Sequence, residues 1–561
     1  MDVKLAYLGR STLTGDDFTK SLSFAPNLAR DPVAFNAAIK NPLRFREAIS
    51  ALHDVVISDL RYKPRDKTGY EAYKAEQQTT DRAIYQRAFQ DAKTQIAVAS
   101  GVTPEQEKEF QRAVKRYWGV RQEYSDFLRK YDPELWRLLM PCDPVITAAE
   151  DVVFFECFSA DESSYGCLAV ERDAFGACDN YQYGTTNVDY SQKLYENFQS
   201  LRTYRATRLA VDPAGFNVKT TGRADYHEEK IDLPGGWLRG FMQLQAAMTL
   251  PMRKVSLSTE CVYSLLAWMK RHKAKRSPRA LRFELIPGQS PKLVLEPWEQ
   301  VIYSHGTRYD GPPSPPIRIW GTRRLMYLSR VLPLTDRFDV YLMGTGLPSF
   351  WVARMGEMRL TIGASGWTTN DWSRGSALDA FRPPSGVLPQ TLSRVSEIVR
   401  AAKSITLDSV ISQSMLDKGA ALGALEQLAR TGQAIYDLDA QRFRWRQIMP
   451  RAVGELDLGP ESPEVAAANG PDLMRHTKIL SRQPGPTGGE ILTAQSGSHQ
   501  IELLINTEGI ITRGKCNCSH HFKFGLRKGP CRHLQVARNI ALAPLAEVAT
   551  PWYERLLSTR N

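Results

Sequence analysis

Gly514-Lys515-Cys516-Asn517-Cys518 and Gly529-Pro530-Cys531-Arg532-His533 are the two most informative stretches of this sequence, and twelve residues separate Cys518 from Cys531. Two cysteines at positions i and i+2 of an extended strand point to the same side, so both thiolates can reach one ion. The second pair can converge on that ion if the cysteine lies in the turn made by glycine and proline and the histidine lies in the first turn of a helix.

Three thiolates and one imidazole form a closed tetrahedral site, which suits structural Zn²⁺ and leaves no position for a reactive water. The sequence therefore predicts a zinc site with four ligands, namely Cys516, Cys518, Cys531 and His533. His520 and His521 lie in the loop between the two motifs and are second choices as ligands. The remaining cysteines show no ligand spacing and are interpreted as ordinary buried thiols.

The segments around these motifs predict a small folded unit. Residues 499–505 and 510–515 are joined by a turn at 506–509, which indicates a hairpin that ends at the first motif. An apolar helix follows Cys531 and carries Leu534, Val536 and Ile540. The predicted unit is a ββα zinc finger over 496–550.

At these residues the sequence resembles the SWIM-type zinc fingers, whose pattern is C-x-C, a variable gap and then C-x-H at the start of a helix. The wider layout is similar to bacterial SWIM-domain proteins encoded beside a MoxR-class AAA+ ATPase and a von Willebrand factor A protein. That resemblance implies a component of an ATPase-driven assembly, with a role in genome defence, and SWIM domains are linked to both DNA binding and protein contacts. Three further stretches carry it: Asp132-Pro133-Glu134-Leu135-Trp136, Gly346-Leu347-Pro348-Ser349-Phe350-Trp351-Val352 and Gly366-Trp367-Thr368-Thr369-Asn370-Asp371-Trp372.

Residues 389–452 form a second predicted unit, in which three helical segments precede two short strands. Thr406 and Asp417 are placed to cap the second and third helices, and Gly432 to close the third. Helix, helix, helix and hairpin is the order of a winged helix. Arg442, Arg444 and Arg446 alternate along the hairpin and therefore share one strand face.

The rest of the chain divides by composition. Residues 1–148 are rich in helix formers and predict a helical domain, with one helix running from Asp31-Pro32 to Val56. Residues 149–388 carry short β-branched and aromatic runs, such as 151–158 and 337–343, and predict a strand-rich α+β domain. Residues 453–495 are acidic and proline-rich and predict a linker. The fold class is thus α+β and multidomain.

Length and composition agree with that division. The chain has 561 residues, enough for three or four domains at about 150 residues each. Eight cysteines are too few for a disulfide scaffold, and no apolar stretch has the length of a membrane span. We therefore expect a cytoplasmic protein without a membrane contact.

The formal charge of +12, from 73 lysines and arginines against 61 acids, favours an anionic partner such as DNA or RNA. No acid occurs from 509 to 546, and Phe522 and Phe524 in that stretch can stack on bases; the alternative is a solvated loop with its phenylalanines packed on the finger. A run at 270–282 has no Phe, Tyr or Trp within it and equally suits an acidic protein surface. The candidate binding cations are Lys515, Lys523, Arg527, Lys528, Arg532, Arg442, Arg444, Arg446, Lys270, Arg271, Lys273, Lys275 and Arg276.

The sequence has no phosphate-binding P-loop, no esterase elbow and no H-E-x-x-H motif. We therefore expect a non-catalytic protein that binds nucleic acid, partner proteins or both, with a pure protein scaffold as one alternative. A metal-dependent nuclease is the other alternative, and it would use the cluster Asp225, His227, Glu228, Glu229 and Lys230.

Overall fold

The computed structural model describes residues 12–15, 19–24, 33–58, 145–187 except 160, 201–203, 206–211, 235–273, 279–366, 387–448 and 471–542 except 528, together with isolated positions elsewhere. The chain divides into two compact units, one of them Leu60–Pro141 and the other made of the remaining residues. All elements discussed below belong to the second unit. Among the described residues, no helix combines the length and the apolar character needed to cross a membrane.

The N-terminal region contains strands where the sequence predicted helix. The strands β1 (Thr12–Gly15), β2 (Thr19–Phe24) and β3 (Ala34–Ile39) join β9 (Ala206–Val211) and β7 (Phe175–Gln182) in a five-stranded sheet of order β1-β2-β9-β3-β7. The predicted helix from Asp31 to Val56 is therefore wrong in its first part. Helix α1 (Pro42–Val56) begins only after Asn41, whose Oδ1 accepts a hydrogen bond from the Arg44 amide at 3.3 Å. The other predicted helices of 1–148 lie outside the described residues.

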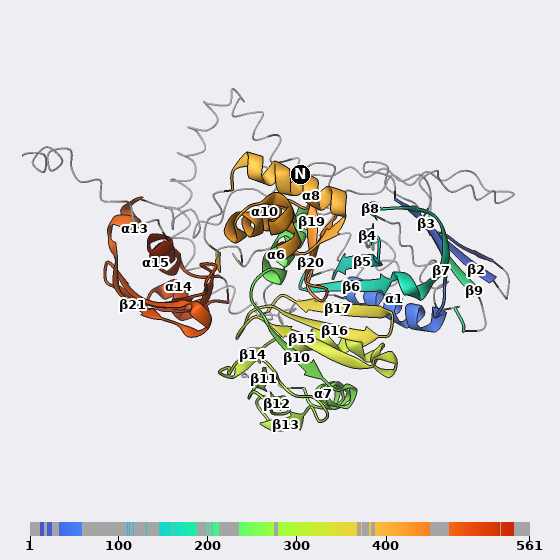
Figure 1. Cartoon of the computed structure of the whole chain (residues 1–561). Coiled ribbons are helices and arrows are strands. Elements are labelled where there is room, and N and C mark those ends of the chain that lie inside the picture. Colours follow the sequence, from blue (N-terminus) through green and yellow to red (C-terminus); the bar gives the residue numbers. More distant parts are fainter. Residues whose placement is uncertain are drawn as a thin grey trace, which may run out of the picture. The chain divides into compact units, whose positions relative to one another are not determined.

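The strand-rich middle region is built on an eight-stranded sheet of order β10-β15-β16-β17-β6-β5-β4-β8 (Figure 1), in which every neighbouring pair is antiparallel. Helix α1 contacts β5 and β6, and the Phe45 ring meets the Phe155 ring edge-on at 5.8 Å. The strands are β10 (Arg253–Leu257), β15 (Arg337–Leu342), β16 (Ser349–Met355), β17 (Met358–Ala364), β6 (Ser164–Glu171), β5 (Val152–Phe158), β4 (Val145–Ala148) and β8 (Gly184–Asn187).

A smaller antiparallel sheet lies within the same region. It contains β11 (Leu281–Glu284), β12 (Lys292–Leu295), β13 (Gln300–Tyr303) and β14 (Ile317–Ile319) in the order β13-β12-β11-β14. Helix α7 (Thr259–Arg271) contacts β13 and lies beside this sheet in Figure 1. Ser258 caps the helix, because its hydroxyl accepts a hydrogen bond from the Cys261 amide at 3.3 Å.

Residues 387–448 have the predicted order of helices and hairpin. Helices α8 (Pro389–Ala402), α9 (Leu407–Ser414) and α10 (Lys418–Arg430) pack on a three-stranded sheet of order β18-β20-β19 and share a core that includes Val395, Val399, Leu425 and Phe443. The strands are β18 (Ser404–Ile405), β19 (Ala434–Asp437) and β20 (Arg442–Trp445). Thr406 and Asp417 cap α9 and α10 as predicted. The assignment as a winged helix stays a prediction.

The C-terminal unit is larger than the predicted finger. Its sheet has the order β21-β22-β23-β24, and α15 (Arg532–Leu542) packs against it (Figure 1). The strands are β21 (Thr477–Pro484), β22 (Glu490–Ser496), β23 (His499–Ile505) and β24 (Ile511–Cys516). The predicted linker at 453–495 is therefore wrong over 477–495, because alternate β22 residues such as Leu492 and Ala494 are buried in the core of the unit. The first part of that segment lies outside the described residues.

Candidate metal centre

The four predicted ligands come together at one end of the C-terminal sheet. Cys516 is the last residue of β24, Cys518 precedes the short helix α14 (Ser519–Phe524), Cys531 lies directly before α15 and His533 lies in the first turn of α15. All four side chains are buried, and their ligand atoms lie within 4.8 Å of one another. The distance from Cys516 Sγ to His533 Nδ1 is 3.8 Å. This group is the one the sequence predicted.

Two glycines allow the second motif to approach the first. Gly529 has a φ of +80°, a left-handed conformation that glycine adopts without strain, and it turns the chain just before Pro530 and Cys531. A Cβ atom on Gly514 would lie 2.9 Å from Leu534 Cδ2, so any other residue there would force the Leu534 side chain at the start of α15 to shift. The buried Gln535 amide fixes the turn further, because its Nε2 donates a hydrogen bond to the Pro530 carbonyl at 2.8 Å.

The ligands are supported by residues that the sequence motifs did not indicate. Asn517 Oδ1 accepts a hydrogen bond from the Gln500 amide at 3.1 Å and lies 3.1 Å from His499 Nδ1. The His499 ring in turn packs on the His533 ring, with centroids 4.4 Å apart. The side chain between the two cysteines thus ties the ligand turn to β23. The only sequence signal for Asn517 is its position between the two cysteines of C-x-C.

Ionisation of all three thiols is energetically unfavourable in the absence of a cation. A hydrogen bond from the Cys531 thiol lowers the pKa of Cys516, and this contact with Cys516 together with burial raises the pKa of Cys531. Burial also raises the pKa of Cys518, although its sulfur accepts a hydrogen bond from the His521 amide at 3.4 Å. One thiolate is therefore favoured, and holding three of them requires a cation among the sulfurs.

The second-choice histidines do not join the ligand group. The group of converging ligand atoms in the described part of the chain comprises three cysteines and His533 only. The His520 ring packs edge-on against the Phe524 ring at 5.2 Å instead. The described cysteines of the middle region, Cys157, Cys167, Cys178 and Cys261, form no disulfide with any described residue and lie outside the ligand group.

The finger cations differ in how they are presented. Lys515, Lys523 and Arg532 are exposed, whereas Lys528 lies outside the described residues. Arg527 is half-buried and donates hydrogen bonds to the carbonyls of Phe524 and Lys523, at 2.8 and 2.7 Å. Of the two phenylalanines, Phe522 exposes 88 % of its surface, while Phe524 is half-buried.

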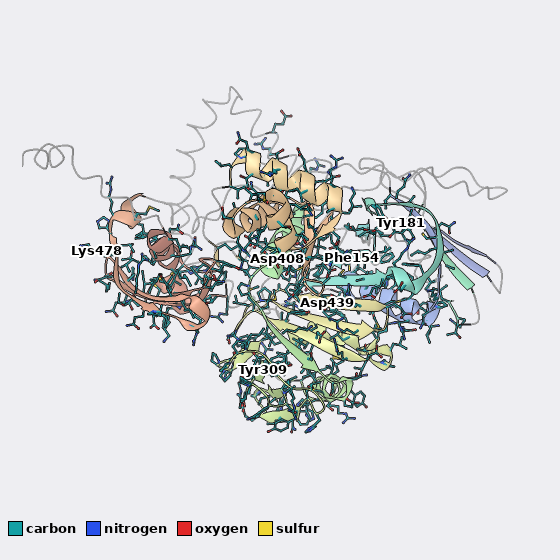
Figure 2. All side chains as sticks on the ribbon, viewed as in Figure 1. Phe154, Tyr181, Tyr309, Asp408, Asp439 and Lys478 are labelled. Atoms are coloured by element: carbon teal, nitrogen blue, oxygen red, sulfur yellow. The ribbon has the colours of Figure 1, made fainter. Side chains whose placement is uncertain are left out.

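Two of the three hairpin arginines are not available to an outside ligand, which corrects the sequence prediction. Arg444 is buried and pairs with Asp151 and Asp437, and Arg446 is buried and pairs with Glu156. Arg442 stays half-buried. The alternation along the strand was real, but the face that carries these arginines is turned toward acids of the eight-stranded sheet. Asp439, labelled in Figure 2, extends this contact by accepting a hydrogen bond from Arg359 of β17 at 2.8 Å.

The run at 270–282 is partly described. Lys270, Arg271 and Lys273 are exposed, and Lys275 and Arg276 lie outside the described residues. Arg282 forms ion pairs within the protein, with Glu284, Glu296 and Glu299. The residues proposed for the nuclease alternative, 225–230, also lie outside the described part of the chain.

No known family and no curated protein matches this chain in sequence. Among solved structures, similarity is found to the proliferating cellular nuclear antigen from Entamoeba histolytica, with 12% identity over 40% of this chain and 89% of that chain and a TM-score of 0.29. It is also found to the C-terminal region of FEN-1 bound to A. fulgidus PCNA, with 12% identity, coverages of 41% and 91% and a TM-score of 0.26. The PCNA2-PCNA3 complex from Sulfolobus tokodaii gives 8% identity, coverages of 40% and 89% and a TM-score of 0.27. TM-scores at this level carry no argument about this chain.

Proposed function

We propose that Cys516, Cys518, Cys531 and His533 hold a structural zinc ion and that the unit around it is a non-catalytic binding module. The observation that carries the proposal is the convergence of four buried soft ligands within 4.8 Å. Three thiolates and one imidazole fill a tetrahedral shell, so the ion has no open position for substrate or water. The ion contributes to the free energy of folding, because it joins the second motif to β24.

The surface of the module favours nucleic acid as the bound partner. Phe522 is almost fully exposed on α14, and Lys523 beside it and Lys515 on β24 are exposed as well. An apolar ring held in water has no role in the core of the module, whereas it offers a face on which a base can stack. Nearby lysines then meet phosphates, which makes binding dependent on salt. The alternative in which both phenylalanines pack on the finger does not account for Phe522.

Zinc content tests the first part of the proposal. Purified full-length protein should contain one zinc ion per chain, and Cys516→Ser should lose it. Ser519→Ala is a matched control, because Ser519 is exposed and lies outside the ligand group. Protein without zinc, or a Cys516→Ser variant that keeps a full equivalent, would show that the assignment is wrong.

Binding of labelled DNA and RNA across salt concentrations tests the second part. Phe522→Ala should weaken binding by roughly tenfold, since base stacking on an aromatic side chain contributes about 1–3 kcal/mol. The control is His521→Ala, next to Phe522 but half-buried. A wild-type protein with no length-dependent affinity for either polymer would instead be a protein scaffold.

The place of the module in a larger assembly is a separate proposal, and it rests on the resemblance to SWIM-domain proteins. We propose that the chain binds a MoxR-class ATPase and a von Willebrand A domain protein. Co-purification with those proteins, when they are encoded beside this chain, tests it. Failure of co-purification in the presence of ATP would remove the assembly role and leave the zinc module unaffected.

A further inference from the structure

The fold places two tryptophan rings beside the basic run at 270–282, which contains no Phe, Tyr or Trp of its own. Trp268 and His272 are one helical turn apart at the end of α7, and their rings are stacked with centroids 4.0 Å apart. Trp298 comes from the turn between β12 and β13, and its ring meets His272 edge-on at 6.2 Å. His272 is exposed, and Trp298 exposes 39 % of its surface.

Among the described residues, four cations of this run have no acidic partner, whereas the glutamates on either side of Trp298 are paired. Lys270, Arg271, Lys273 and Arg279 are exposed and form no ion pair with any residue that the structure describes. Glu296 and Glu299, which flank Trp298 in the sequence, both accept hydrogen bonds from Arg282, at 2.5 and 2.6 Å. Glu296 also accepts one from Arg318 at 2.9 Å. Within the described residues, these glutamates therefore do not neutralise the positive charges at 270–273 and 279.

Helix stability alone does not explain this arrangement. Cations in the last turn of α7 interact favourably with the helix dipole, which accounts for Lys270 and Arg271. It does not account for Arg279, which lies beyond the helix, or for the partial exposure of the Trp298 indole. Exposed large aromatic rings among unpaired cations are the combination that single-stranded nucleic acid binding requires.

We infer that the α7 platform, made of His272, Trp298, Lys270, Arg271 and Lys273, binds single-stranded nucleic acid. A base stacks on the exposed face of Trp298 or His272, and the backbone phosphates contact the cations. Unpaired strands are favoured over a duplex because only an unpaired base can present its face to a side chain. An acidic protein surface would use the same cations but has no need of the indole.

This platform is separate from the zinc module. Its residues lie at the C-terminal end of α7, directly after that helix, and in the β12–β13 turn, and none comes from 471–542. Binding at the platform therefore does not require the function proposed for the finger. The two proposals can fail independently, which the choice of variants below exploits.

Fluorescence anisotropy of full-length protein with a labelled single-stranded oligonucleotide and with the matching duplex tests the inference. Trp298→Ala should weaken single-strand binding roughly tenfold, and Trp298→Phe should keep most of the affinity. Combined replacement of Lys270, Arg271 and Lys273 by glutamate should reduce the salt slope by about 2, at about 0.7 per lost phosphate contact. Both effects should persist in Cys516→Ser protein if that variant keeps its thermal transition, and otherwise in Phe522→Ala protein.

Tyr263→Ala is the matched control, because Tyr263 exposes 60 % of its surface on the same helix without joining the ring stack. It should bind as wild type does. The inference is overturned if Trp298→Ala, shown by circular dichroism to be folded, binds the single strand as tightly as Tyr263→Ala. It is also overturned if polyglutamate displaces the oligonucleotide completely while the Trp298 variants are indistinguishable, since the platform would then be a site for acidic protein.

Discussion

Arg446 is joined to Glu156 by two hydrogen bonds, from its Nη1 to Oε1 at 2.8 Å and to Oε2 at 2.7 Å, and neither side chain reaches solvent. Tyr165 also donates its hydroxyl to Glu156 Oε1 at 2.7 Å. The pair connects the end of the β19–β20 hairpin to β5 of the eight-stranded sheet, across 290 residues of sequence. Such a pair contributes little by itself, yet removing one partner leaves a buried charge without compensation.

We therefore expect Arg446→Met to destabilise the protein by about 3–5 kcal/mol, because Glu156 would stay buried without its counter-ion. Urea unfolding followed by circular dichroism measures the change. Arg394→Met is the control, since Arg394 is exposed on α8. The double variant Arg446→Met with Glu156→Gln should regain most of the loss, because the amide is neutral and still accepts from Tyr165. Equal stability of Arg446→Met and wild type would contradict the buried-pair interpretation.

Acid should weaken a second contact of the same sheet. Asp339 accepts hydrogen bonds from Arg354 Nε at 2.5 Å and Ser256 Oγ at 2.7 Å. Burial acts to raise its pKa, but these hydrogen bonds and the guanidinium outweigh it and hold the pKa below its ordinary value. A lowered folded-state pKa means that the stabilisation is present above about pH 4 and is lost as the pH falls through the folded-state pKa.

Asp339→Asn should therefore lower the urea midpoint at about pH 7. Its difference from wild type should shrink as the pH falls from about 4 through the lowered folded-state pKa, below which the wild-type carboxylate is itself protonated. Asp310→Asn serves as the control, because Asp310 is exposed. A difference between Asp339→Asn and wild type that stays constant from neutral to acid pH would mean that the charge of Asp339 does not matter.

The close contact of β24 and α15 predicts a specific effect on zinc retention. Gly514→Val would place new carbon atoms where Leu534 already lies, and overpacking of this kind costs about 1–3 kcal/mol. Because α15 carries His533, we expect the variant to release zinc to a chelator faster than wild type. Thr512→Val, at an exposed position of the same strand, should behave like wild type. Identical release from Gly514→Val would show that the helix can move away from the strand without disturbing the site.

The boundary of the zinc module can be tested with two fragments. A fragment of residues 470–545 keeps β21 and β22, whereas one of 496–550 leaves the partners of Leu492 and Ala494 without cover. We expect the longer fragment to bind one zinc ion and to show amide protection in its strands. The shorter one should bind zinc weakly and without a cooperative thermal transition. A stable, cooperative 496–550 fragment would restore the smaller finger that the sequence predicted.

The elements that were predicted correctly depend on residues close together in sequence. The elements that were missed depend on contacts between segments far apart in sequence. The ligand set was predictable because C-x-C on a strand and C-x-H at a helix start constrain side-chain direction within a few residues. The strand β3 was not predictable, because Phe35 and Ile39 are four residues apart and would share one face of either a helix or a strand. Pairing with β7 and β9, more than a hundred residues later, decided between them.

The partners of the charged residues were missed for the same reason, because they lie far away in the sequence. Alternation placed Arg444 and Arg446 on one face of the hairpin, but the acids that bury this face, Asp151 and Glu156, lie about three hundred residues earlier. Trp298 joins the basic run through the β12–β13 turn, which no pattern within 270–282 indicates. Prolines at 484 and 486 suggested a linker, although they lie at the turn between β21 and β22 and break no strand interior.

The choice of histidine ligand gives the last prediction. His533 is buried with its Nδ1 3.8 Å from Cys516 Sγ, whereas His520 and His521 lie on α14 outside the ligand group. His533→Ala should therefore lose most of the bound metal, while His520→Ala and His521→Ala should each keep one equivalent. With Co²⁺ in place of zinc, the visible spectrum should show tetrahedral coordination and thiolate bands in wild type and in both α14 variants. Retention of metal by His533→Ala together with its loss from His521→Ala would assign the fourth ligand to the loop instead.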